Sequence, residues 1–122
     1  MENALIIDDN RQIADTLAQM LEFFNIKAHM AYGARPALAS LKDLTPSIVF
    51  LDLNMPGLTG FDVLQFLKRE PRLAEVPVIV VTSDDQPESA QRAIEIGATA
   101  YVIKPISLDV LEETLKALDL LF

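Results

Sequence analysis

The chain has 122 residues, of which 51% are hydrophobic, and 18 acidic against 10 basic residues give a formal net charge of −8. A chain of this length forms one domain and buries roughly two-thirds of its unfolded surface, while its acidic balance argues against direct binding of nucleic acid, which needs a basic footprint. The absence of cysteine excludes disulfides, thiolate metal sites and a cysteine nucleophile. No apolar run is long enough for a signal peptide or a membrane span. We therefore expect a single cytoplasmic domain, residues 1–122, and the ordinary Met1 start favours a complete protein.

Short apolar runs alternate along the chain with segments in which apolar residues recur at steps of three and four. The short runs, bounded by turn residues, are typical of buried strands, and the periodic segments of helices. In chain order the sequence predicts a strand at 4–7, a helix at 13–24, a weak strand at 27–32, a helix at 36–44, a strand at 48–51, a helix at 61–70, a strand at 78–81, a helix at 87–96, a strand at 101–103 and a helix at 107–118. This strict alternation predicts an α/β fold with a parallel sheet and right-handed crossovers.

Four of the five predicted strands end on polar residues. These are Asp8 and Asp9 after the first strand, Asp52 after the third, Thr82 and Ser83 after the fourth, and Lys104 after the fifth. In an open α/β sheet the ligand site lies just beyond the carboxyl ends of the strands. We therefore expect three carboxylates, a hydroxyl pair and one ammonium to meet at a single edge.

Three carboxylates in one place repel one another, so the site needs either a proton or a cation. Mg²⁺ is a hard ion that takes oxygen ligands and often shares them with a phosphate. A carboxylate flanked by a metal, the Lys104 ammonium and the Thr82 hydroxyl is suited to forming an acyl phosphate. Asp52 stands alone on a central strand and is the best nucleophile, whereas Asp8 and Asp9 are adjacent and better placed to hold the metal.

Five motifs in fixed order, each at the end of its own strand or helix, carry a resemblance to a known family. They are Asp8-Asp9, the turn-rich loop 52–60, Val81-Thr82-Ser83, Gly97-Ala98 and Lys104-Pro105. Over essentially its whole length the chain resembles the CheY-like receiver domains of response regulators in bacterial two-component signalling. The resemblance implies a flavodoxin-like, doubly wound (βα)5 fold with a five-stranded parallel sheet in the order 2-1-3-4-5.

The resemblance also assigns roles at the site. Asp52 would be the phosphoacceptor, taking its phosphoryl group from a histidine kinase or a histidine phosphotransfer protein. Asp9, Asp52 and the backbone carbonyl of Asn54 would ligate Mg²⁺, and Asp8 would act mainly through a bound water. The protein would then be a signalling switch and not an enzyme, catalysing only its own phosphoryl transfer and autodephosphorylation.

Switching is implied at residues on the last two strands. Lys104 would pair with Asp52 and then with the phosphoryl group, and its bond to Pro105 would be cis. Thr82 would swing toward the phosphoryl oxygen, and Tyr101 would move from exposed to buried. The signal would reach a protein target through the last two helices and the strand between them, with the chain a monomer or weak dimer and without an output domain.

Two positions of the family tune the loss of the phosphoryl group, those two residues after the acceptor and two after the switch hydroxyl. Here they are Asn54 and Asp84, a polar pair able to orient an attacking water. We predict a short-lived phosphorylated state.

Three other functions compete with this interpretation. A pseudo-receiver would bind partners without phosphorylation, which the intact acid set disfavours. A flavodoxin-like cofactor carrier needs Ser, Thr and Gly after the first strand, where Asp8-Asp9-Asn10 would repel phosphate. An aspartyl hydrolase of the haloacid-dehalogenase kind needs a second acid two residues after its nucleophile, where this chain has Asn54.

A few aromatic and ionisable residues lie outside these motifs. His29, the single histidine, is expected at the surface or rim, and Phe122 is either a last core contact or part of an exposed patch. The helical and strand periods assign five phenylalanines to the core. These are Phe23, Phe24, Phe50, Phe61 and Phe66.

Overall fold

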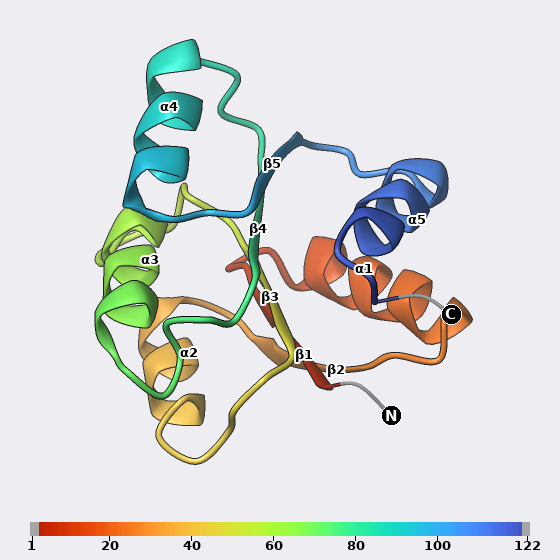
Figure 1. The fold of residues 1–122 in the computed structure, drawn as a ribbon, viewed down its shortest axis with the longest axis horizontal. Coiled ribbons are helices and arrows are strands. Elements are labelled where there is room, and N and C mark those ends of the chain that lie inside the picture. The colour runs from red at the N-terminus through yellow and green to blue at the C-terminus, as the bar shows by residue number, and fades with distance from the viewer. Residues whose placement is uncertain (1–2, 121–122) are drawn as a thin grey trace.

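Five strands and five helices alternate along the chain in the computed structural model, which describes residues 3–120 (Figure 1). The strands are β1 (Asn3–Ile7), β2 (Lys27–Ala31), β3 (Ile48–Leu51), β4 (Val78–Thr82) and β5 (Ala100–Ile103). The helices are α1 (Arg11–Phe23), α2 (Ala34–Ser40), α3 (Gly60–Arg69), α4 (Pro87–Ile96) and α5 (Leu108–Ala117). All neighbouring strands pair in parallel, in the order β2-β1-β3-β4-β5. The predicted fold class and strand order are confirmed.

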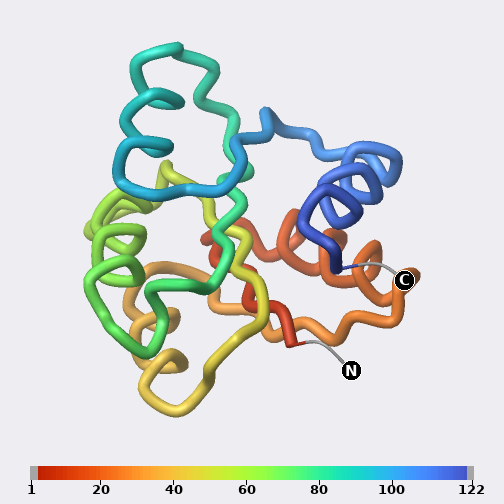
Figure 2. Tube along the Cα trace, in the orientation of Figure 1, coloured from red at the N-terminus to blue at the C-terminus, as the bar shows by residue number. Residues whose placement is uncertain are grey.

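The sheet is covered on both faces, by α1 and α5 on one side and by α2, α3 and α4 on the other (Figures 1 and 2). Successive strand residues alternate between two hydrophobic clusters, because side chains of a strand point to opposite faces. On β3, for example, Val49 and Leu51 join the cluster under α2, α3 and α4, while Ile48 and Phe50 join the cluster under α1 and α5. Burial on both faces explains why the strands are continuous apolar runs, with polar residues only at their ends.

Side-chain caps fix where three of the helices begin. The Asn10 side chain accepts a hydrogen bond from the Ile13 amide at the start of α1, and Ser107, the predicted N-cap of α5, accepts one from the Val110 amide. A capping box, in which the Thr59 side chain caps α3 and the Asp62 side chain bonds back to the Thr59 amide, opens α3. Each cap lies in a loop that follows a strand, so it also fixes the loops at the carboxyl edge of the sheet.

The sequence analysis placed two phenylalanines wrongly. Phe23 is 71% exposed and Phe66 is 38% exposed, whereas Phe50 is buried and Phe24 and Phe61 are partly buried. Phe24 packs against the cluster beneath α1, and the Phe23 ring lies perpendicular to the Phe24 ring, with ring centroids 5.2 Å apart. Adjacent helical residues point about 100° apart, so only one of such a pair faces the core.

The second helix is shorter than predicted, ending at Ser40 instead of near residue 44. The Arg72 guanidinium donates hydrogen bonds to the carbonyls of Leu41 and Leu44 just beyond its end. A cation at this end stabilises carbonyl groups that have no helical partner. A residue distant in sequence therefore bonds to the carbonyls that follow α2, and the helical period gave no sign of this contact.

His29 is exposed, as predicted, and Phe122 lies outside the described residues. Among the helices between residues 3 and 120, none has the length and apolar character to cross a membrane.

Gly60, the first residue of α3, is packed against the backbone that carries the third predicted acid. A Cβ at this position would lie 2.2 Å from the carbonyl oxygen of Asp52 and 2.6 Å from the Cα of Leu53. Backbone cannot rotate away as a side chain can. The start of α3 can therefore pack this closely against the backbone of Asp52 only because residue 60 has no side chain.

We predict that Gly60→Ala lowers the free energy of unfolding by about 3 kcal/mol, the upper range for forcing an extra carbon into a packed site. Gly57→Ala in the same loop is the matched control, because a Cβ there has open space around it and only its φ of +79° is unfavourable. That strain costs about 1 kcal/mol. Urea unfolding of both variants tests this, and equal losses would contradict it.

Candidate functional site

The three predicted acids meet at the carboxyl edge of the sheet. Asp8 and Asp9 follow β1 and Asp52 follows β3, and these strands are neighbours paired up to Ile7 and Leu51. The Asp52 amide donates to the Ile7 carbonyl at 2.9 Å, which extends the ladder to the acid itself. One carboxylate oxygen from each acid lies within 4.8 Å of those of the other two. The regular sheet thus fixes the backbone of the cluster.

Two of the acids are nearly buried and each is held by the loop that follows it. Asp8 is 4% and Asp52 is 5% exposed, while Asp9 is exposed. Oδ1 of Asp8 accepts from the Asn10 amide at 2.9 Å, and Oδ1 of Asp52 accepts from the Asn54 amide at 3.2 Å. One oxygen of each buried carboxylate is therefore fixed by backbone, and the second points to another partner.

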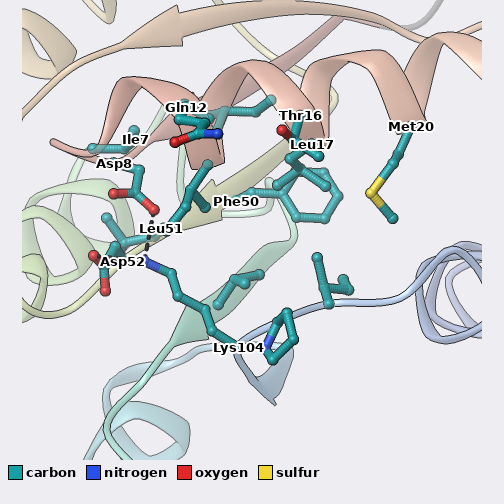
Figure 3. Close-up of a pocket in the computed structure, with 16 residues that line it drawn as sticks. Ile7, Asp8, Gln12, Thr16, Leu17, Met20, Phe50, Leu51, Asp52 and Lys104 are labelled. Atoms are coloured by element: carbon teal, nitrogen blue, oxygen red, sulfur yellow. Dashed lines mark hydrogen bonds and ion pairs between the residues drawn. The ribbon is translucent and has the colours of Figure 1, made fainter.

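That partner is the ammonium of Lys104. Its Nζ lies 2.8 Å from Oδ2 of Asp8 and 3.1 Å from Oδ2 of Asp52 (Figure 3). The Lys104 amide also donates to the Thr82 carbonyl at 2.8 Å, and the peptide bond to Pro105 is cis, as expected. The sequence suggested a pair with Asp52; the structure adds a second, shorter contact with Asp8.

Burial and pairing act in opposite directions on these groups. Burial raises the pKa of Asp8, and the hydrogen bonds from Lys104 and the Asn10 amide offset this only in part. Burial lowers the pKa of Lys104, but bonding to Asp8 and the charge of Asp52 outweigh it and leave this pKa raised. One ammonium is shared by two carboxylates, so the centre keeps an excess negative charge, to which Asp9 adds.

This donor set fits a magnesium ion. Three carboxylates offer hard oxygen ligands at one place, and the excess negative charge is what a divalent cation would neutralise. Asp8, Asp9 and Asp52 are the residues that could hold it.

Thr82 and Tyr101 both bond to the backbone of one residue, Asp84, the first through its amide and the second through its carbonyl. Thr82 is fully buried at the end of β4, and its Oγ1 accepts from the Asp84 amide at 3.3 Å. The hydroxyl of Tyr101, a partly buried residue of β5, donates to the Asp84 carbonyl at 2.7 Å. The movement expected of Tyr101 stays a prediction, but its partner in this conformation is now identified.

Asp84 has a second set of contacts through its side chain. Its Oδ1 accepts from the Gln86 amide at 3.0 Å, and a hydrogen bond from Ser89 lowers its pKa. The sequence analysis chose Asp84 for its position in the motif. It did not predict that the backbone of Asp84 bonds to both Thr82 and Tyr101. Backbone contacts of this kind leave no pattern of residue types in a sequence.

Comparison with known proteins identifies the family. The response regulator receiver domain model matches residues 4–116, so the chain belongs to this family. Receiver domains are signalling modules of two-component response regulators and bind Mg²⁺ in an acidic site, which agrees with the Asp8, Asp9 and Asp52 cluster. The predicted family is confirmed.

Individual relatives agree with this assignment. The chain is 35% identical over 109 residues to a probable cyclic di-GMP phosphodiesterase of Vibrio cholerae, covering 88% of this chain and 24% of that protein. It is 31% identical over 113 residues to the phosphate regulon transcriptional regulatory protein PhoB of Pseudomonas aeruginosa, covering 93% of this chain and 49% of that protein. The matched region thus spans about a quarter of the length of the first relative and about half of the second.

Solved structures match along almost the whole chain. The signal receiver domain of a DNA-binding response regulator protein (merR) from Colwellia psychrerythraea 34H has a TM-score of 0.90 at 33% identity and covers 98% of both chains. The chemotaxis protein CheY4 of Vibrio cholerae has a TM-score of 0.89 at 26% identity and covers 96% of this chain and 98% of its own.

We expect the hydroxyl of Tyr101 to make the domain less stable at alkaline pH. Burial first, and then the charge of Asp84 and the acids near it, raises the pKa of Tyr101 to about 12. An unfolded tyrosine ionises near pH 10, so the contribution is fully present below pH 10 and is lost as the pH rises from 10 toward 12. Because the ring is only partly buried, we expect a loss of about 1 kcal/mol and not the full value of the shift.

Tyr101→Phe should remove this loss. Urea unfolding of both proteins at pH 9 and pH 11.5 gives the difference in their free energies of unfolding. We expect the advantage of the tyrosine protein to be smaller at pH 11.5. Lysines also titrate in this range, but they do so in both proteins and cancel in the difference. An advantage that stays constant would contradict the assignment.

Proposed function

We propose that the chain is a phosphorylation-controlled switch in which Asp52 accepts a phosphoryl group from a histidine kinase or a histidine phosphotransfer protein. One observation supports this above all others, the nearly buried Asp52 carboxylate held between the Asn54 amide and the Lys104 ammonium, beside two further acids. A structural acid would need neither the shared ammonium nor the neighbouring carboxylates, which repel it.

The transfer needs few groups. An oxygen of Asp52 attacks phosphorus and forms the new P–O bond, and the bond to the donor breaks with its electron pair leaving on the donor. Asp8, Asp9, Asp52 and the carbonyl of Asn54 would hold Mg²⁺, which supplies charge neutralisation for the phosphoryl oxygens when bound. Lys104 lies within hydrogen-bond distance of the acceptor and orients it.

Phosphorylation would change the charge balance around Lys104. The phosphoryl group brings up to two negative charges and three acceptor oxygens, so the ammonium gains a stronger partner than Asp8. The Lys104 amide is bonded to the Thr82 carbonyl, and Thr82 is linked through Asp84 to Tyr101. A rearrangement at the acid cluster would therefore reach β5 and the start of α4, and a shift of a few kcal/mol changes partner affinity many-fold.

We place the partner surface on α4, β5 and α5. The resemblance to receiver domains supports this, and four large apolar side chains on these elements or at their ends are exposed. They are Ile94, Ile103, Leu108 and Val110. The same residues would serve a receiver that stands alone and one that is joined to an output domain.

Intact mass after incubation with acetyl phosphate and Mg²⁺ tests the proposal. We expect the gain of one phosphoryl group, and no gain with Asp52→Asn or with EDTA. Asp52→Asn keeps the size and hydrogen-bonding shape of the side chain, so it should remain folded. A gain that persists in Asp52→Asn would place the acceptor elsewhere, and a chain that takes no phosphoryl group from acetyl phosphate or from kinases would be a pseudo-receiver.

The lifetime of the phosphorylated state tests the part of Asp84. Asp84→Leu should slow loss of the phosphoryl group about tenfold, because the polar group proposed to orient the attacking water is removed. Asp85→Leu is the matched control, since it removes the same charge from an exposed neighbour. The measurement is the decay of phosphorylated protein after the donor is removed; equal lifetimes in both variants would show that charge alone decides the rate.

A further inference from the structure

A pocket of about 270 Å³ lies beside the acid cluster, between α1 and the loop that joins β5 to α5 (Figure 3). Phe50 and Val81 contribute its floor from the sheet, Leu17 and Met20 line it from α1, and Ile106 lines it from the loop. The function proposed above uses only its rim, where Asp8, Asp52 and Lys104 stand.

The pocket is large enough for a small organic molecule. An apolar cavity of about 150 Å³ in another protein holds a benzene molecule. A space of about 270 Å³ therefore has room for one ring with a short side chain. Because the deeper lining is almost entirely aliphatic and aromatic, the part of a ligand that enters it must be apolar.

The rim of the pocket selects the charge of the ligand. Two carboxylates and one ammonium leave one negative charge in excess there, and Asp9 has a carboxylate oxygen within 4.8 Å of the other two acids. A carboxylate or phosphate on the ligand would meet this charge and an ammonium that is already paired twice. A cationic group would instead find carboxylate lone pairs that the protein leaves open.

We propose that this pocket binds small apolar monoamines, with the ring or branched chain between α1 and the β5–α5 loop and the ammonium against Asp8 and Asp52. The side chains of Gln12 and Thr16 line the same pocket from α1, and both residues are exposed, so they lie where the pocket meets solvent. Such a ligand competes with a divalent cation for the same carboxylates. The unphosphorylated chain is the form that binds it, so the proposal does not require that Asp52 accept a phosphoryl group.

The test uses 2-phenylethylamine as the probe, with 2-phenylethanol and 3-phenylpropionate as its neutral and anionic analogues. Binding to the unphosphorylated chain is measured by protein-observed NMR in EDTA, with no phosphodonor present. We expect a Kd on the order of 1 mM for the amine and about tenfold weaker binding of the alcohol, which lacks the charge-assisted contact. Saturating Mg²⁺ should reduce the advantage of the amine, because it neutralises the carboxylates.

Two variants locate the site. Thr16→Trp places a large side chain at the entrance and should abolish binding of the amine, whereas Gln19→Trp, at an exposed position of α1 outside the pocket, should leave it unchanged. In the unmodified chain, NOEs from the probe ring to the methyl groups of Leu17 and Ile106 give the same information without a substitution.

Several results would overturn the proposal. Binding of 3-phenylpropionate as tight as that of the amine would show that the rim does not select a cation. NOEs to other parts of the surface, or equal losses in the two tryptophan variants, would show that the pocket is not the site. Each of these outcomes is independent of whether Asp52 accepts a phosphoryl group.

Discussion

The arrangement of the site depends on one ammonium shared by two buried carboxylates. Lys104 bonds to both Asp8 and Asp52, which end different strands, while its own strand lies at the edge of the sheet. Two carboxylates at this depth would repel each other without it. The ion pair thus connects β1, β3 and β5 across the width of the sheet, and any group that competes for the ammonium or for the carboxylates acts on all three strands together.

The two sides of the site differ in how they are held. Asp8 and Asp52 follow adjacent central strands and are fixed by ladder hydrogen bonds, by the Asn10 and Asn54 amides and by the close approach of Gly60. Thr82 and Tyr101 also lie in paired strands, but each of their hydroxyls makes a single hydrogen bond, to the backbone of Asp84 in the loop after β4. A new charge at Asp52 would therefore act more on the hydroxyls of Thr82 and Tyr101 than on the backbone of the two acids, because each hydroxyl is held by one hydrogen bond.

Much of this could be predicted from the sequence. Strands buried on both faces must be continuous apolar runs, so a polar residue ending such a run marks the sheet edge, and this placed Asp8, Asp52, Thr82 and Lys104 together. The contact between Lys104 and Asp8 could not be predicted, because sequence orders the strands without giving side-chain directions at their ends. The hydrogen bond from Tyr101 to the Asp84 carbonyl could not be predicted either, because every residue has a backbone carbonyl and the sequence does not mark which one is the acceptor. Phe23 was misplaced because the apolar stripe through Leu17 and Leu21 continues to Phe24, and its aromatic neighbour was assigned to the core with it.

The pocket beside the site also has one side fixed by the sheet and one side formed by a loop. Its floor, from Phe50 and Val81, is part of the sheet, whereas Ile106 lies in the loop that directly follows Lys104 and Pro105. A movement of Lys104 toward a new charge at Asp52 would carry this loop with it and change the width of the pocket. Conversely, a ligand that holds the loop against α1 would restrict Lys104. If both proposals hold, occupancy of the pocket and the charge on Asp52 would be linked through one side chain, and thermodynamic linkage would require that each affect the other equally in free energy.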